Sequence, residues 1–438
     1  MTLTTPITVV RGRFLDIQKT VSQAQDIIDQ VRYIEDGVLI AKQGQIRWFG
    51  SWDDAQAHLP ANVEIQHYPE QLIIPGMIDT HIHFPQTEMV GAYGEQLLSW
   101  LNTYTFPTEI QFQDPSYAQK IAEFFIQELL KNGTTTALVF CTVHPESVDA
   151  LFEAAAQQQM RLIAGKVMMD RHAPEALCDT AESAYEDSKA LIGKWHGQGR
   201  ALYAITPRFA PTSTPEQLER AGQLKAEFPD VYVHTHLSEN KDEIAWVKDL
   251  FPEQKGYLDV YHHYGLTGNR SVFAHCVHLE DAEWQCMHET DSAIAFCPTS
   301  NLFLGSGLFP LKKTWQQQVK VGLGTDIGAG TSFSLLQTVN EAYKVQQLQG
   351  DKLSAFESLY HATLGGAKAL DLDDKLGNFN VGKEADFVVL NLKPTALQQL
   401  RQSRSKSIED SLFALFTMGD DRNIEATYIY GQKAYSQS

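Results

Sequence analysis

The segment that most constrains the fold of this chain is Pro75–Gln86, in which a mainly apolar run ends in two histidines, His81 and His83, separated by one residue. Successive side chains of a β-strand point to opposite faces, so these two imidazoles would point the same way. Two imidazoles on one face at the end of a strand can hold a metal ion. The segment therefore predicts a metal site whose remaining ligands lie at the ends of other strands.

Eight short apolar runs that end in polar residues follow one another through the middle of the chain, and helical segments separate many of them. The runs are Leu72–His83, Thr135–Val143, Arg161–Asp170, Ala201–Pro207, Val231–His236, Ser271–His275, Ser292–Pro298 and Val319–Asp326. The clearest intervening helices are Ser116–Lys131, Glu146–Gln159, Thr180–Trp195, Pro215–Phe228, Asn240–Leu250 and Ser332–Gln349. Units of this size predict a (β/α)8 TIM barrel, an α/β fold whose catalytic groups lie at the C-terminal ends of the strands.

Both ends of the chain are rich in β-forming residues. The strand-like segments are Ile7–Phe14, Val38–Ala41, Ile46–Phe49 and Val63–Tyr68 near the start, and Ala385–Leu392 and Ile424–Ala434 near the end. Because chain termini commonly lie close together, we expect these segments to pair in one small β domain. This division assigns residues 1–73 and 376–438 to the β domain and residues 74–375 to the barrel.

The last residues of the eight runs test the barrel prediction, because they should carry the chemistry. Metal-ligand types occur at His81 and His83 in the first run, at His236 in the fifth and at Asp326 in the eighth. Three imidazoles and a carboxylate suit one divalent ion, Zn²⁺ first and Fe²⁺ second. An isolated buried histidine is usually structural, but these candidates all fall where a barrel would bring them together.

The fourth run ends next to Arg208, which favours a single metal ion over a pair. Two-metal sites commonly need a carboxylate or a modified lysine between the ions, and an arginine cannot bridge two cations. His275, at the end of the sixth run, would then face the reacting atom. Glu239 lies three residues after His236 at the start of a predicted helix, where its carboxylate can reach the same point.

The composition excludes several classes of function. The chain has 438 residues, and its formal net charge of −19 argues against binding to nucleic acid or to anionic membranes. Its five cysteines form no C-x-x-C pair, which fits a reducing cytoplasm better than a disulfide framework. We expect no secretory signal at Met1–Pro6, and no membrane span, because no apolar run reaches about 18 residues.

Several of these motifs together resemble those of the amidohydrolase superfamily and, within it, of the bacterial guanine deaminases, over nearly the whole chain. The residues that carry the resemblance are Pro75–Gln86, Thr206–Phe209, His234–Asn240, Phe273–Cys276, Gly324–Asp326 and Gly382–Phe387. The resemblance implies a TIM barrel with a small β-sandwich domain, one zinc ion per chain and a homodimer. It also implies hydrolytic deamination of guanine to xanthine and ammonia in purine catabolism, with guanine and water as the reactants.

The residues that would recognise a purine are Arg208, Gln86 and Phe209. Guanine offers acceptors at O6 and N7, the pair that a bidentate arginine reads in nucleic-acid complexes. Arg208 supplies a rigid fork of donors, Gln86 offers both a donor and an acceptor, and Phe209 can flank the planar ring. The alternative for Arg208 is a structural salt bridge, and for Gln86 and Phe209 it is ordinary packing.

The hypothesis for the reaction is metal-assisted hydrolysis at C2 of the purine, with Glu239, Asp326 and His275 as catalytic residues. Glu239 would take a proton from the attacking water and deliver it to N3. Asp326 would bind the metal and pass a proton to the leaving amine, and His275 would orient the nucleophile or stabilise charge at the tetrahedral centre. We also assign His236 to the substrate-binding set, together with these three residues. The alternative for Glu239 is a carboxylate that stabilises a helix N-terminus.

Three other functions remain open. A related hydrolase would deaminate adenine-type nucleosides, pterins or triazines, because metal ligands specify the attack and not the ring. A catalytically dead relative would serve in assembly, but it would lack a ligand or the acid–base glutamate, and a two-metal amidase would need the bridging lysine. The segment Tyr93–Glu109 is long for a barrel loop, and its aromatic residues suit a lid or an interface.

Overall fold

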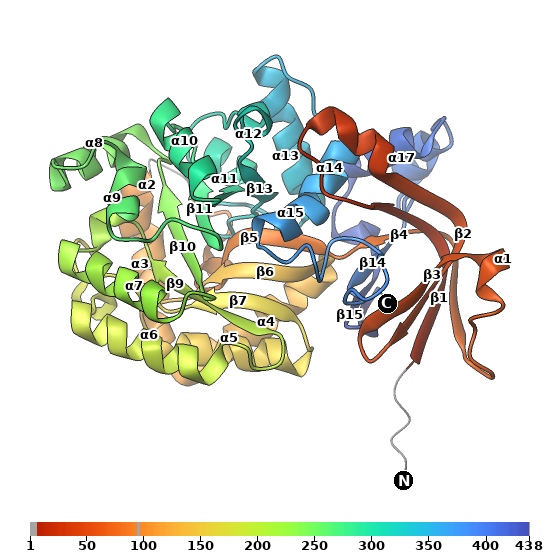
Figure 1. The fold of residues 1–438 in the computed structure, drawn as a ribbon, viewed down its shortest axis with the longest axis horizontal. Coiled ribbons are helices and arrows are strands. Elements are labelled where there is room, and N and C mark those ends of the chain that lie inside the picture. The colour runs from red at the N-terminus through yellow and green to blue at the C-terminus, as the bar shows by residue number, and fades with distance from the viewer. Residues whose placement is uncertain (1–6, 94–96, 438) are drawn as a thin grey trace, which may run out of the picture.

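The protein, a computed structural model, is described for residues 7–93 and 97–437 and consists of a barrel and a separate β-sheet (Figure 1). Residues 1–6, where we expect no secretory signal, lie outside the described residues. So do residues 94–96 of the segment expected to be a lid or an interface.

A nearly closed barrel of eight parallel strands forms the centre of the molecule, and this confirms the predicted (β/α)8 fold. The strands are β5 (Met77–His83), β6 (Thr134–Phe140), β7 (Arg161–Gly165), β9 (Ala201–Pro207), β10 (Tyr232–Leu237), β11 (Ser271–His275), β12 (Ala293–Phe296) and β13 (Lys320–Leu323). The two-residue strand β8 (Val167–Met168) pairs with β9 outside this order. Each of the eight apolar runs contains one barrel strand.

Helices surround the barrel where the sequence predicts them. The six expected helices are α4 (Pro115–Lys131), α5 (Pro145–Gln157), α6 (Ala181–Trp195), α7 (Pro215–Glu227), α8 (Lys241–Leu250) and α13 (Leu335–Leu348). Asp114 and Thr214 cap α4 and α7 by accepting hydrogen bonds from backbone N–H groups, and a proline occupies the first turn of both helices. Within residues 7–93 and 97–437, no helix has both the length and the hydropathy to cross a membrane.

Shorter helices complete the barrel layer and were not expected from the sequence. They are α9 (Tyr257–His263), α10 (Asp281–Glu289), α11 (Pro298–Phe303), α12 (Leu311–Gln317), α14 (Ala355–Ala362) and α15 (Leu364–Ala369). Most of them span two turns or fewer, so their apolar positions are too few to show a helical period.

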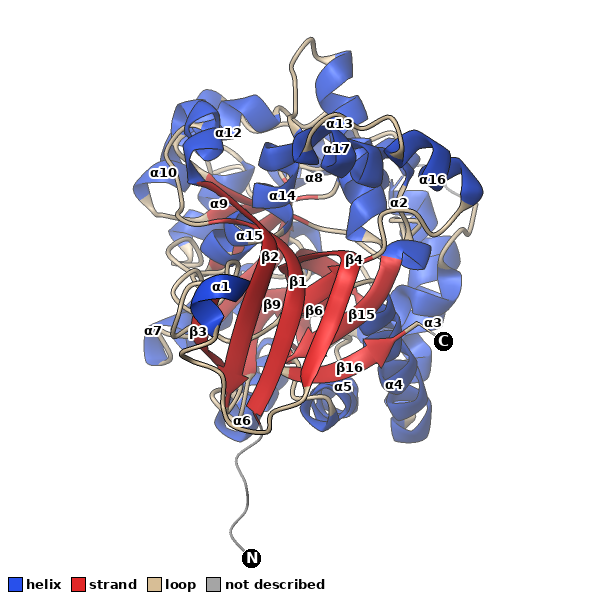
Figure 2. Cartoon of the chain, turned by 90° about the vertical axis from the view of Figure 1, so that its right-hand side faces the viewer, coloured by secondary structure: helices blue, strands red, loops and turns tan. Residues whose placement is uncertain are grey.

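The second unit is a seven-stranded mixed sheet built from both ends of the chain, as predicted (Figure 2). Its strands, in spatial order, are β16 (Gln432–Ser436), β15 (Ile424–Ile429), β14 (Phe387–Leu390), β4 (Ile65–Pro75), β1 (Ile7–Ile17), β2 (Val31–Lys42) and β3 (Gln45–Ser51). Alternate residues of β1 pack on opposite faces of the sheet. Val10 and Phe14 join one apolar cluster, whereas Val9 joins another with the short helix α1 (Trp52–Ala55).

Two features of this sheet differ from the expectation. The predicted run Leu72–His83 divides at Gly76, because residues 72–75 pair with β14 and only Met77–His83 enters the barrel. A side chain at Gly76 would collide with Thr135, so the chain can turn there only as glycine. In addition, α16 (Ala396–Gln402) and α17 (Ile408–Met418) interrupt the β-rich C-terminal segment, and α17 packs on α13 and α14 of the barrel.

The barrel closes between its first and last strands through single contacts instead of a ladder. The N–H of Asp326 donates to the carbonyl of His81 at 2.9 Å, and the hydroxyl of Thr80 donates to the carbonyl of Leu323 at 3.0 Å. These bonds hold the C-terminal ends of β5 and β13 side by side.

A buried ion network joins the sheet to the barrel. Glu384, just before β14, accepts hydrogen bonds from Arg161 of β7 at 2.5 and 3.0 Å and from Arg200 at 2.5 Å. Arg200 also binds Asp386. Burial alone raises the pKa of Glu384, but the two guanidinium groups outweigh it and lower the pKa below its usual 4.5. The network therefore stabilises the ionised form of Glu384.

Replacement of Glu384 by Gln should lower the free energy of unfolding by about 3 kcal/mol at neutral pH, because it leaves buried guanidinium charge uncompensated. Since the folded-state pKa is depressed, the contribution of Glu384 is complete above 4.5 and is lost as the pH falls through the folded value. Urea unfolding of both proteins at about pH 7 and about pH 3 tests this.

The difference between wild type and Glu384→Gln should shrink in acid. The matched control is Glu182→Gln, which removes an exposed pair with Arg220 and should cost less than about 1 kcal/mol at either pH. Equal destabilisation by the two variants would contradict the structural role of the network.

Candidate active site

A cavity opens at the C-terminal ends of the barrel strands and gathers the predicted site residues. Its lining consists of His83, Gln86, Leu97, Trp100, Leu101, Arg208, Phe209, His236, Glu239, Glu243, His275, Leu304, Asp326 and Ala329. Of the residues that the sequence singled out, only His81 lies behind this lining, and it contacts Asp326. The barrel thus brings all the candidates to one place.

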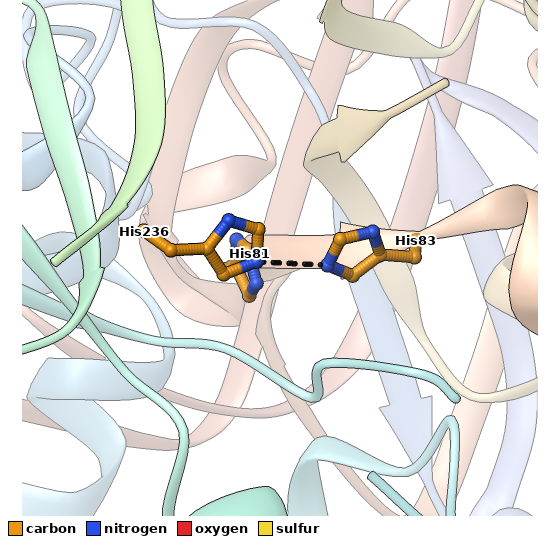
Figure 3. Close-up of side chains that lie close together, drawn as sticks. All are labelled: His81, His83 and His236. Atoms are coloured by element: carbon orange, nitrogen blue, oxygen red, sulfur yellow. Dashed lines mark hydrogen bonds between the residues drawn. The ribbon is translucent and has the colours of Figure 1, made fainter. Parts of the chain in front are cut away.

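Three histidines form the floor of the site (Figure 3). His81 and His83 project from the same end of β5, and His236 projects from β10. The Nε2 atoms of His83 and His236 lie 3.2 Å apart, and a ligand nitrogen from each of the three histidines falls within 4.8 Å of the others. One oxygen of Asp326 lies 3.1 Å from Nε2 of His81 and 3.4 Å from Nε2 of His83.

The surroundings of these histidines leave them neutral and fix which nitrogen faces inward. Burial, followed by the neighbouring imidazoles, lowers the pKa of His81, His83 and His236 well below 6.5. Nδ1 of His81 lies 2.8 Å from Nε2 of His234, and Nδ1 of His236 donates to the carbonyl of Arg208 at 2.7 Å. Such outer contacts orient an imidazole so that its other nitrogen can bind a metal.

The donor set fits a divalent cation. Nε2 of His81 is buried and has no hydrogen-bond partner among the described residues. Unsatisfied buried nitrogens that converge on a carboxylate are costly without a cation between them. Neutral imidazole and carboxylate are the ligands of Zn²⁺ and of Fe²⁺.

A second group with metal-binding geometry overlaps the first and consists of His81, His275 and Cys297. The sequence did not single out Cys297. Burial, together with the nearby carboxylates, raises the pKa of its thiol well above 9.0. Cys297 would have to lose its thiol proton to bind a metal, whereas one oxygen of Asp326 lies within 3.4 Å of both His81 and His83. The histidines with Asp326 are therefore the better candidate.

Glu239 and His275 lie close together in the cavity, and Asp326 is also close to His275. Nε2 of His275 lies 3.5 Å from Glu239 and 3.8 Å from Asp326. Burial lowers the pKa of His275, but these two carboxylates outweigh it and raise the pKa above 6.5. Burial also raises the pKa of Glu239. In both groups the shift favours the protonated form.

Two residues that the sequence did not identify hold this pair. Asn301 accepts a hydrogen bond from Nδ1 of His275 at 2.9 Å, and the hydroxyl of Ser306 donates to Glu239 at 2.9 Å. Both lie in the region after β12, which carries no motif that would mark them. The contacts of Asn301 with His275 and of Ser306 with Glu239 form only in the folded barrel.

Glu243 holds the backbone that carries Glu239. Its Oε2 accepts from the N–H groups of Glu239 and Asn240, each at 3.1 Å, and its Oε1 accepts from the hydroxyl of Tyr257 at 2.7 Å. Burial raises the pKa of Glu243 to about 7, with a further contribution from Glu239. The sequence contains a signal for this contact, because Asn240 followed by Glu243 is a capping-box pattern.

The side of the cavity formed by Arg208 and Gln86 contains a carboxylate that was not identified from the sequence. Nη1 of Arg208 donates to both oxygens of Glu109, at 2.7 and 3.0 Å, and Nε2 of Gln86 donates to Glu109 at 3.2 Å. Glu109 is the only charged residue in the stretch 97–113, and that isolation was the available signal. Phe209 lines the same part of the cavity.

From Leu97 onwards, the segment expected to be a lid or an interface is helical. It consists of α2 (Leu97–Trp100), the π-helix η3 (Leu101–Thr105) and α3 (Phe106–Glu109), and η4 (Ile110–Gln113) follows it. Leu97, Trp100 and Leu101 line the cavity. π-Helical turns often occur at functional sites. The segment therefore forms a wall of the site, and its movement stays a prediction.

Known proteins resemble this chain over its whole length. Residues 72–434 match the profile of the Amidohydrolase family. A guanine deaminase of Escherichia coli (strain K12) is 62% identical over 429 residues, which covers 98% of each chain. The solved structure of E. coli guanine deaminase superposes with a TM-score of 0.96 at 60% identity, covering 99% of this chain and 100% of that chain. A C. acetobutylicum guanine deaminase with guanine bound in its active site superposes with a TM-score of 0.88 at 31% identity, covering 98% and 100%.

Metal analysis of the purified protein should find about one equivalent of a divalent cation per chain. The His83→Asn variant should lose the metal, because it removes one converging nitrogen, whereas His275→Asn should retain it. Inductively coupled plasma mass spectrometry after dialysis measures both. Two equivalents per chain, or full retention in His83→Asn, would show that the ligand set is different.

Proposed function

The chain belongs to the amidohydrolase family and, within it, to the guanine deaminases, and from this premise we propose that it hydrolyses guanine to xanthine and ammonia. One observation carries the proposal. The candidate metal ligands, a buried glutamate beside a histidine, and an arginine paired with a glutamine line a single cavity. The first two elements suit hydrolytic attack on a ring carbon, and the third suits recognition of an oxopurine.

Recognition of guanine is assigned to Arg208, Gln86 and Phe209. Guanidinium donors suit the acceptors at O6 and N7 of guanine. Phe209 is almost fully buried in the wall of the cavity, where its ring can flank the planar base. These contacts favour an oxopurine over triazines and adenine-type nucleosides, for which the metal ligands alone would serve equally well.

A single divalent cation would be held by His81, His83, His236 and Asp326, with Zn²⁺ favoured over Fe²⁺. When bound, it supplies the Lewis acidity that makes water nucleophilic near neutral pH. Arg208 stands at the end of β9, where a group bridging two cations would otherwise lie, and this supports one ion per chain.

Proton transfers are assigned to the residues around the reacting carbon. Glu239 takes a proton from water as the water oxygen attacks C2, and gives it to N3 of the ring. Asp326 then takes the remaining proton of the oxygen bonded to C2 and passes it to the amino group as the C2–N bond breaks, so that the C2 carbonyl forms, ammonia leaves and xanthine remains. His275, whose pKa the two carboxylates raise, stabilises negative charge on the attacking oxygen.

The setting of this activity is also part of the proposal. We infer a cytoplasmic homodimer that acts in purine catabolism. The five cysteines form no disulfide, which suits a reducing compartment. The dimer rests on the family resemblance alone.

A substrate panel with ammonia detection tests the proposed function. The panel contains guanine, adenine, cytosine, guanosine, a pterin and a triazine, each incubated with the metal-loaded protein. Guanine should be turned over with a kcat/KM far above that of every other ring, because adenine, cytosine and the triazine lack the pair of acceptors at O6 and N7, and guanosine and the pterin differ from guanine elsewhere in size and shape. Activity on another ring without activity on guanine would refute the proposal.

The Glu239→Gln variant should retain its metal but lose about 10²–10⁴-fold in kcat, because an amide cannot transfer the proton. Glu384→Gln, a buried substitution of the same kind in the ion network, should keep the wild-type kcat. Normal turnover by Glu239→Gln would remove Glu239 from the chemistry.

A further inference from the structure

Glu109 has no part in the chemistry, yet its carboxylate is buried directly behind the two side chains assigned to base recognition. Glu109 is fully buried, and its carboxylate accepts hydrogen bonds from both Arg208 and Gln86. Arg208 also lies over the ring of Phe106, with its guanidinium carbon 5.6 Å from the ring centre. A carboxylate can be buried in its charged form only where hydrogen bonds and opposite charges compensate the cost of removing it from water.

The contact with Glu109 determines which end of the Gln86 amide faces the cavity. A carboxylate can only accept hydrogen bonds, so the amide must turn its nitrogen towards Glu109 and its oxygen away. Within the described part of the chain, Oε1 of Gln86 accepts no hydrogen bond. This oxygen lies against the backbone of Gly328, where a Cβ would come within 2.0 Å of it. Because Gln86 lines the cavity beside Ala329, its acceptor lies at the cavity wall.

The same contact leaves donors on Arg208. Nη1 is engaged by Glu109, whereas Nε and Nη2 make no hydrogen bond with the described residues. The ion pair also balances the charge of the guanidinium, so the recognition surface as a whole is neutral. Two donors and one acceptor of fixed orientation then face the substrate.

We propose that Glu109 is a positioning residue that sets the hydrogen-bond polarity with which the cavity reads the base. Donors of Arg208 beside the acceptor of Gln86 complement a ring edge on which a carbonyl adjoins an N–H group. In guanine this edge is O6 with N1–H. The inference rests on the proposed function and names the part of the substrate that is read. An edge with an unprotonated N1, as in 2-aminopurine, meets the acceptor of Gln86 and is rejected.

The first test compares guanine with 2-aminopurine, which carries the same amino group at C2 but lacks the carbonyl and the N1–H. A site built around such hydrogen bonds should reject the analogue by about 10⁴-fold or more in kcat/KM. In Glu109→Gln the amide of Gln86 is free to turn. The kcat/KM for guanine should fall about tenfold to a hundredfold, while that for 2-aminopurine should rise.

A merely structural role for Glu109 predicts a different result. Loss of packing would lower both values by the same factor, and that outcome would overturn the proposal. So would 2-aminopurine turnover that stays undetectable in Glu109→Gln. Glu384→Gln serves as the control for buried charge, because it should leave the ratio of the two substrates at its wild-type value.

A charge swap keeps the proposal testable if Glu109→Gln folds poorly. The double variant Gln86→Glu/Glu109→Gln restores one carboxylate beside Arg208 and keeps an acceptor at position 86. It should exceed Gln86→Glu in kcat/KM for guanine by about fivefold or more, whereas independent sites would place it below that single variant. A double variant no more active than Gln86→Glu would overturn the proposal. If the wild type does not deaminate guanine, the proposed function fails instead, so the two failures are distinguishable.

Discussion

Closure of the barrel between β5 and β13 is the constraint on which both the fold and the site depend. Asp79 is fully buried at this seam and accepts hydrogen bonds from the N–H groups of His81 and Thr325, each at 3.1 Å, and from the hydroxyl of Thr325 at 2.5 Å. Burial raises the pKa of Asp79 to about 7, although these bonds oppose the shift. The seam places His81 beside Asp326, and without it the four candidate ligands would not meet.

The backbone is strained where these strands end. His275 and Asp326 adopt left-handed conformations, with φ of 71° and 52°, and Cys276 and Ser238 do the same beside them. Such conformations cost about 1–3 kcal/mol each in residues other than glycine and persist only where the surroundings enforce them. The closed barrel supplies that enforcement. The strained backbone turns these side chains towards one cavity instead of letting them follow the strand.

Much of this arrangement was predictable because it follows from local periodicity. His81 and His83 share a strand face, and the end of each apolar run marks where His236, His275 and Asp326 lie. Glu109 stood out in the sequence only as an isolated charge, and its contacts were not predictable because its partners lie far from it in sequence. The division at Gly76 was missed for a related reason. Residues 72–78 carry no polar side chain that marks a boundary, and only the strand partners assign the two parts of the run to different sheets.

The order of the chain has a consequence for biosynthesis. The first strand of the sheet is tied to the last residues of the protein, for example by the bond from Thr8 to Gly431 across 423 positions. Contacts of such long range form slowly, because a long loop must close first. On the ribosome, His81 and His83 emerge long before Asp326. The nascent chain therefore carries two exposed imidazoles without their carboxylate partner until translation of the barrel is nearly complete.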